Sequence, residues 1–121
     1  MNKYRNKPCE IGGEKYRSQR EAKRHQDLLL LQKGGALRNL RREVVYVLAD
    51  PVVIGGRRRP ALRYVADFVY EKTCAVAWTH EGTRMPFWEV IVEDAKGVRT
   101  EGYRIKRHLM KSVHGIDILE T

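Results

Sequence analysis

The chain has 121 residues, the length of one domain, and 42% of them are hydrophobic, which suffices for a core without disulfide bonds. No apolar run approaches the ~20 residues of a membrane span, and the basic, polar N-terminus lacks the apolar segment of a signal peptide. Cys9 and Cys74 are too far apart for a zinc knuckle. We therefore expect a single domain over residues 1–121 in a reducing cytoplasm.

The charge of the chain is strongly positive and unevenly distributed. There are 24 lysines and arginines against 15 aspartates and glutamates, a formal net charge of +9. Residues 1–63 carry a net charge of +10, whereas residues 64–121 carry −1. A cationic surface of this kind predicts a polyanionic partner, either nucleic acid or an anionic membrane.

The first elements in chain order are a hairpin, a helix and a strand. Gly12-Gly13 divides two short segments of a basic lead-in at residues 1–17, which is typical of a small β-hairpin. Ser18 begins a helix, with Glu21 as its capping-box partner, and Gly34-Gly35 ends it. An apolar strand follows at residues 43–49.

The second half of the chain adds strands and one helix. Residues 50–60 are rich in turn formers and predict a hairpin with Arg57, Arg58 and Arg59 near its tip. The elements predicted after it are a strand over 62–71 that extends through 75–77, a loop over 79–86, a strand over 87–95, a helix from Thr100 to about Val113 that Gly115 stops, and a strand over 116–119.

The resulting order is helix, three strands, helix, strand. The strands contain nearly continuous apolar runs, as expected when both faces of a sheet are covered. We predict an α/β fold of the α+β type, a small mixed sheet with helices on both sides.

Acidic residues interrupt two of these strands. Alternation places Tyr64, Ala66, Phe68 and Tyr70 on one face of strand 62–71 and Asp67 on the other face between two valines. A buried carboxylate needs a cation, a metal ion or a hydrogen-bond donor. Asp94 and Lys96 share one face at the end of strand 87–95, opposite Ile91, Glu93 and Ala95. The structural alternatives are a turn cap for Asp67 and a surface ion pair for Asp94 and Lys96.

Two residues of the predicted helices, Glu21 and Lys106, also have two possible roles each. Glu21 is either a solvent-facing cap that reaches back to the Ser18 amide, or a carboxylate directed at the sheet with His25 and Leu28. Lys106 lies within the apolar stripe of the second helix, so it either snorkels to water or serves the site. Carboxylates that converge from a helix and adjacent strands suit Mg²⁺ or Mn²⁺, and a neighbouring lysine suits phosphodiester hydrolysis.

These residues give the chain a recognisable pattern. It resembles the PD-(D/E)XK nuclease superfamily, with its restriction-endonuclease-like fold, and more narrowly a family of small phage and prophage endonucleases, some of them Holliday-junction-resolvase-like. The resemblance rests on Lys3–Lys7 (KYRNK), Gly12–His25 (GGEKYRSQREAKRH), Leu62–Tyr70 (LRYVADFVY), Val92–Gly97 (VEDAKG) and Tyr103–Met110 (YRIKRHLM). Ala66 stands where the superfamily motif has a proline.

The resemblance implies a Mg²⁺- or Mn²⁺-dependent endodeoxyribonuclease in the cytoplasm of a bacterial host. Asp67, Asp94 and Glu21 would bind the metal, with the Ala95 carbonyl as a further ligand. Lys96 would position or activate the water, and Lys106 would contact phosphate. The remaining predicted DNA contacts are Lys3, Arg5, Arg41, Arg42, Arg57, Arg58, Arg59, Arg107 and Lys111.

Three functions are consistent with the sequence. The leading one is a phage or prophage endonuclease acting on duplex or branched DNA; a junction resolvase would imply a homodimer, because it must cut two strands. The second is a catalytically inactive DNA-binding protein on a nuclease fold. The third is a basic virion or host-interaction protein whose acidic residues serve only the structure.

Overall fold

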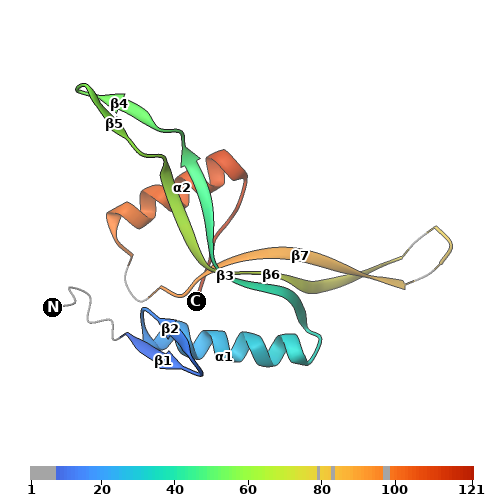
Figure 1. Ribbon diagram of the computed structural model, residues 1–121. Helices are drawn as coiled ribbons and strands as arrows, with labels where there is room; N and C mark the ends of the chain where they lie inside the picture. The colour runs from blue at the N-terminus through green and yellow to red at the C-terminus, as the bar shows by residue number, and fades with distance from the viewer. Residues whose placement is uncertain (1–7, 79, 83, 97–98) are drawn as a thin grey trace.

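The fold follows from a computed structural model that describes residues 8–78, 80–82, 84–96 and 99–121 (Figure 1). The core elements, in chain order, are α1 (Gln19–Lys33), β3 (Leu37–Ala49), β6 (Leu62–Trp78), β7 (Arg84–Asp94), α2 (Glu101–His114) and β8 (Leu119–Glu120). Two short hairpins accompany them: β1 (Cys9–Ile11) with β2 (Glu14–Tyr16), and β4 (Val52–Ile54) with β5 (Arg57–Arg59). The predicted order of core elements is therefore confirmed.

The core strands form one sheet in the order β3-β6-β7-β8. The pairs β3–β6 and β6–β7 are antiparallel, whereas β7 and β8 are parallel. The chain thus has the mixed sheet and the α/β composition that the sequence predicts.

The two helices cover opposite faces of this sheet. Phe68 and Tyr70 pack with Leu28 of α1, whereas Val69, between them in β6, packs with Tyr103 and Met110 of α2. Successive strand residues point to opposite faces. The sheet is therefore the middle layer, with α2 on one side and α1 on the other (Figure 1).

Local capping sets the ends of both helices. Ser18 Oγ accepts a hydrogen bond from the Glu21 amide over 3.1 Å, and Thr100 Oγ1 accepts one from the Tyr103 amide over 3.1 Å. Gly115 ends α2 in the left-handed conformation, with φ 70°. Within the described residues, neither helix combines the length and the apolar character that crossing a bilayer requires.

Three strand boundaries differ from the prediction because long-range pairing determines them. β3 begins at Leu37 rather than residue 43, since its basic first half pairs with β6, where Arg38 contacts Glu71. β7 begins at Arg84, paired with Trp78, so the predicted loop over 79–86 is too long; residues 79 and 83 lie outside the described residues. The last strand comprises only Leu119–Glu120, not 116–119, because β7 offers it only two partners.

The predicted alternation along β6 is wrong at Asp67. Tyr64 and Ala66 pack on the α2 side of the sheet, whereas Phe68 and Tyr70 pack on the α1 side. The break has a backbone cause: β6 pairs with β7 only from Phe68 onward. On the other neighbouring strand, Glu43 has φ 51° and lies between the residues that pair with Ala66 and Phe68.

Candidate active site

The two predicted motif aspartates meet where β6 and β7 separate. Antiparallel pairing of these strands ends at Phe68 and Glu93, so Asp67 and Asp94 are the next residues on each strand. The Ala95 amide donates a hydrogen bond to Asp67 Oδ2 over 2.9 Å. Asp67 thereby joins the two strands at the point where the backbone ladder stops.

Asp94 is buried and contacts Lys96 directly. Its Oδ2 accepts a hydrogen bond from the Tyr64 hydroxyl over 2.6 Å, and its Oδ1 lies 3.2 Å from Lys96 Nζ. That approach lacks hydrogen-bond geometry, so Oδ1 accepts no hydrogen bond within the described part of the chain. The pairing of Asp94 and Lys96 is therefore confirmed, but Asp94 is an interior carboxylate and not half of a surface ion pair.

A cavity of about 320 Å³ opens beside these residues. It brings together two acidic side chains and three basic ones. Its lining consists of Arg17, Tyr64, Val65, Asp67, Asp94, Lys96, Thr100, Gly102, Tyr103 and Lys106. Four residues singled out from the sequence thus line one cavity: Asp67 on β6, Asp94 at the end of β7, Lys96 just after β7 and Lys106 on α2.

Electrostatics in this cavity favour an added positive charge. Burial, followed by the negative charge of Asp94, raises the pKa of Asp67 to about 7, and Glu21 contributes in the same direction. The hydrogen bond from the Ala95 amide opposes this rise. Burial and Asp94 also raise the pKa of Tyr64, so its phenol remains a hydrogen-bond donor at neutral pH.

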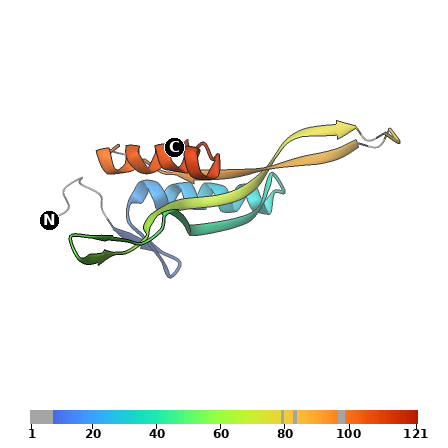
Figure 2. The ribbon, with the colours of Figure 1, turned by 90° about the horizontal axis from the view of Figure 1, so that it is seen from above.

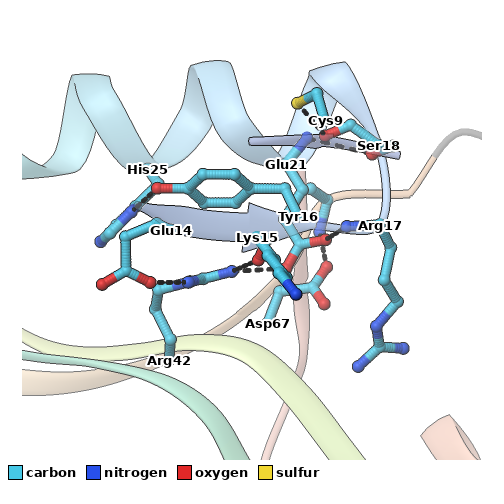
Figure 3. Close-up of polar contacts among 11 residues, drawn as sticks. Cys9, Glu14, Lys15, Tyr16, Arg17, Ser18, Glu21, His25, Arg42 and Asp67 are labelled. Atoms are coloured by element: carbon cyan, nitrogen blue, oxygen red, sulfur yellow. Dashed lines mark hydrogen bonds and ion pairs between the residues drawn. The ribbon is translucent and has the colours of Figure 1, made fainter. Parts of the chain in front are cut away.

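Glu21 lies inside the protein, next to Asp67. Its Oε2 accepts a hydrogen bond from the Arg17 amide over 3.2 Å, not from the Ser18 amide that a capping box would use. Its Oε1 is 3.5 Å from Arg42 Nη2 and accepts no hydrogen bond within the described residues. Figure 3 shows its side chain reaching from α1 toward Asp67. Of the two interpretations of Glu21, the inward one describes its carboxylate.

Arg42 is partly buried and bound to the N-terminal hairpin. Its guanidinium donates to Glu14 Oε2 over 2.6 Å and to the Lys15 carbonyl over 3.0 Å, and it stacks on Tyr16 at 4.2 Å from the ring centroid (Figure 3). These contacts hold the β1–β2 hairpin against β3. Arg42 therefore positions the Glu21 side of the site.

The oxygen donors present fit a hard divalent cation. Among the described residues, no group of three or more His, Cys, Asp and Glu side chains is close enough to hold a metal ion. Mg²⁺, however, is commonly bound through one or two carboxylates, and water or substrate phosphate supplies the other ligands. Asp67 and Asp94 supply the two carboxylates, and Asp94 Oδ1 is buried without a hydrogen bond.

The other predicted DNA contacts are scattered over the surface. Arg41 is exposed on β3, and Arg57, Arg58 and Arg59 are exposed on the β4–β5 hairpin. Arg107 lies 3.2 Å from Glu120, and Lys111 lies 2.7 Å from Asp117. Lys3 and Arg5 fall outside the described residues.

Three residues of the site were missed from the sequence. Arg17 and Tyr64 line the cavity, and Arg20 Nη1 donates to the Lys96 carbonyl over 2.7 Å, which fixes the backbone after β7. Tyr64 carried a signal, because a tyrosine in a buried strand needs a partner for its hydroxyl. The two arginines carried none, since they resemble the other basic residues of the N-terminal half.

The comparisons with known proteins give a family and nothing beyond it. Residues 1–115 match the family described as "Protein of unknown function (DUF1064)". No curated protein and no solved structure matches the chain.

Proposed function

The chain belongs to the DUF1064 family, and we propose that it is a metal-dependent DNA endonuclease built on a PD-(D/E)XK core. One observation carries the proposal: Asp67, Asp94 and Lys96 converge in a cavity that Arg17 and Lys106 also line. Paired carboxylates beside a lysine, with further cations around them, are suited to hydrolysis of a phosphodiester bond.

Each side chain has a distinct task in this reaction. Asp67 and Asp94 would hold Mg²⁺ or Mn²⁺, and the Ala95 carbonyl is a further candidate ligand. The bound ion would supply a Lewis acid that activates water and neutralises phosphate charge. Lys96, held beside Asp94 by the 3.2 Å ion pair, would orient the attacking water. Lys106 and Arg17 would bind the phosphates of the DNA strand.

Glu21 completes the acidic side of the site. Its carboxylate faces Asp67 and is anchored by the Arg17 amide, so it would contact the metal through a water molecule. Arg42 would keep this carboxylate in place and limit its repulsion of Asp67. The site thus draws on α1, α2, β3, β6 and the end of β7 with the residues that follow it.

The test is cleavage of labelled DNA by the full-length protein with Mg²⁺, Mn²⁺ or EDTA. The substrates are a four-way junction, a fork, a duplex and a single strand. We expect metal-dependent cleavage, with Lys96→Ala at least about 100-fold slower. Lys72→Ala is the matched control, because Lys72 is an exposed lysine of β6 outside the cavity.

The outcomes separate the two leading functions. Loss of cleavage in Lys96→Ala with retention in Lys72→Ala would support the endonuclease, and the preferred substrate would indicate its role. Binding without cleavage, unchanged by EDTA and by Asp67→Ala, would overturn it in favour of a catalytically inactive DNA-binding protein.

A further inference from the structure

The β4–β5 hairpin extends from the body of the protein as an exposed arm. Figures 1 and 2 show it projecting away from the helices, as the continuation of β3 and β6. All six of its strand residues are exposed. Val53 is 71% exposed and Ile54 is 61% exposed, the highest values among the large aliphatic strand residues that the structure describes. The interior of the protein therefore does not explain this composition.

The register of the arm sets each aliphatic side chain beside an arginine. Val52 pairs with Arg59, Val53 with Arg58, and Ile54 with Arg57. Because side chains alternate along a strand, each face of the arm carries both aliphatic groups and guanidinium groups. Gly55 and Gly56 form the turn with φ 58° and 79°, so the tip is narrow and has no side chains.

The charges of the arm have no partner in the part of the chain that the structure describes. None of its three arginines makes an ion pair or a side-chain hydrogen bond to the residues that the structure describes. Three like charges in a row repel one another, and a two-stranded extension that packs against no helix or third strand gains little stability of its own in water. A polyanion that also accepts apolar side chains would compensate both costs. The DNA minor groove is such a surface, since proteins enter it with arginines and apolar wedges.

We propose that the β4–β5 arm enters the minor groove of the duplex that flanks the cleavage site, with Ile54 as an apolar wedge and Arg57, Arg58 and Arg59 along the phosphates. This inference rests on the proposed endonuclease function and adds the form of its substrate. From Asp67 to Arg57 the chain spans ten residues, at most about 36 Å. The arm therefore reaches duplex within about one helical turn, roughly 10 bp, of the cleaved phosphate.

The experiment measures DNA binding and bending in EDTA, so that no strand is cut. Duplexes with a fluorophore at each end report affinity and, by energy transfer, bending. Ile54→Ser should weaken binding by about tenfold and abolish the bend, while the dependence of affinity on salt stays unchanged. Arg58→Ala should instead reduce the slope of log affinity against log salt by about 0.9.

Two α1 variants serve as matched controls. Leu30 is 69% exposed, so Leu30→Ser removes an aliphatic side chain as exposed as Ile54. Lys33→Ala removes one exposed charge from the last turn of α1. Both should bind and bend DNA like the wild type. Shortening the flanking duplex below about 10 bp should remove the advantage of the wild type over Ile54→Ser.

The outcomes distinguish this inference from the proposed function. Normal binding and bending by Ile54→Ser and Arg58→Ala, beside a wild type that binds DNA, would overturn the role of the arm alone. Arm variants that change only self-association, measured by sedimentation, would overturn it in favour of a protein contact. Failure of the wild type to bind any DNA would overturn both proposals.

Discussion

The burial of Asp67 disfavours the negative charge of its own carboxylate. Asp67 lies at the separation of β6 and β7, buried and close to Asp94 and Glu21, and it accepts a hydrogen bond from the Ala95 amide. A negative charge on Asp67 is therefore unfavourable when no cation is bound. Such a cost is typical of a site that binds a cation.

The raised pKa of Asp67 predicts how stability depends on pH. An acid whose pKa lies above its ordinary value of about 3.9 holds its proton more tightly in the folded state, so stability falls as pH rises from about 4 to about 7. Asp67→Asn removes this loss. We expect the variant to be about 2 kcal/mol more stable than the wild type at pH 7.5, and the gain to be smaller at pH 5.

Urea denaturation without metal, at pH 7.5 and at pH 5, measures the stability gain at each pH. Asp27→Asn is the control, because it neutralises an exposed carboxylate of α1; it should behave alike at the two pH values. If Asp67→Asn is less stable than the wild type at both pH values, the proposed crowding of carboxylates is wrong.

At the scale of elements, one buried carboxylate fastens α1 to the sheet. Glu93 of β7 is completely buried, and Arg24 of α1 donates two hydrogen bonds of 2.8 Å to it. The Tyr70 hydroxyl donates a third, also of 2.8 Å. This network lies one residue from Asp94, on the opposite face of the sheet, so it fixes the strand that carries the site.

Replacing Arg24 alone should lower the free energy of unfolding more than replacing Arg24 and Glu93 together. Arg24→Met leaves an unpaired buried carboxylate and should reduce the free energy of unfolding by about 3 kcal/mol. Adding Glu93→Leu removes that carboxylate and should restore part of the loss, although the Tyr70 hydroxyl then lacks its acceptor.

Chemical denaturation of the two single variants and the double variant completes the cycle. Lys23→Met is the control, because it replaces an exposed neighbour on the same helix; its effect should be within about 0.5 kcal/mol. Additive losses in the double variant would contradict a coupled pair.

At the scale of the whole molecule, the charge distribution predicts the response to salt. The net charge is +9, and the cavity and the β4–β5 arm together offer Arg17, Lys106 and three arm arginines to the DNA backbone. Each phosphate neutralised contributes about −0.9 to the slope of log affinity against log salt. We expect a slope of about −4.5 for duplex DNA.

Fluorescence anisotropy at several salt concentrations provides the slope. The same titration with an uncharged DNA analogue, whose backbone has no phosphates, should give a slope near zero. Equal affinity for DNA at low and moderate salt would contradict the electrostatic account of binding.

Many residues of the site could be predicted individually from the sequence, but which of them contact one another could not. The spacing of Asp94 and Lys96 places both on one face of a strand, and the structure confirms their contact. The burial of Asp67 was predicted from its flanking valines, but its neighbours depend on where β6 leaves β7. Glu21 stayed open, because a capping glutamate and an inward one have the same local sequence.

The sequence by itself determined the features that depend on neighbouring residues. Ser18, Thr100 and Gly115 define helix ends through their own caps, and Gly55-Gly56 defines the turn of the arm. Only the tertiary structure decided the extent of β3, the break in alternation at Asp67 and the partners of Glu21 and Arg42. The physical reason is distance along the chain. Caps and turns are completed within a few residues, whereas the Arg38–Glu71, Glu21–Arg42 and Asp67–Ala95 contacts each join residues more than twenty positions apart.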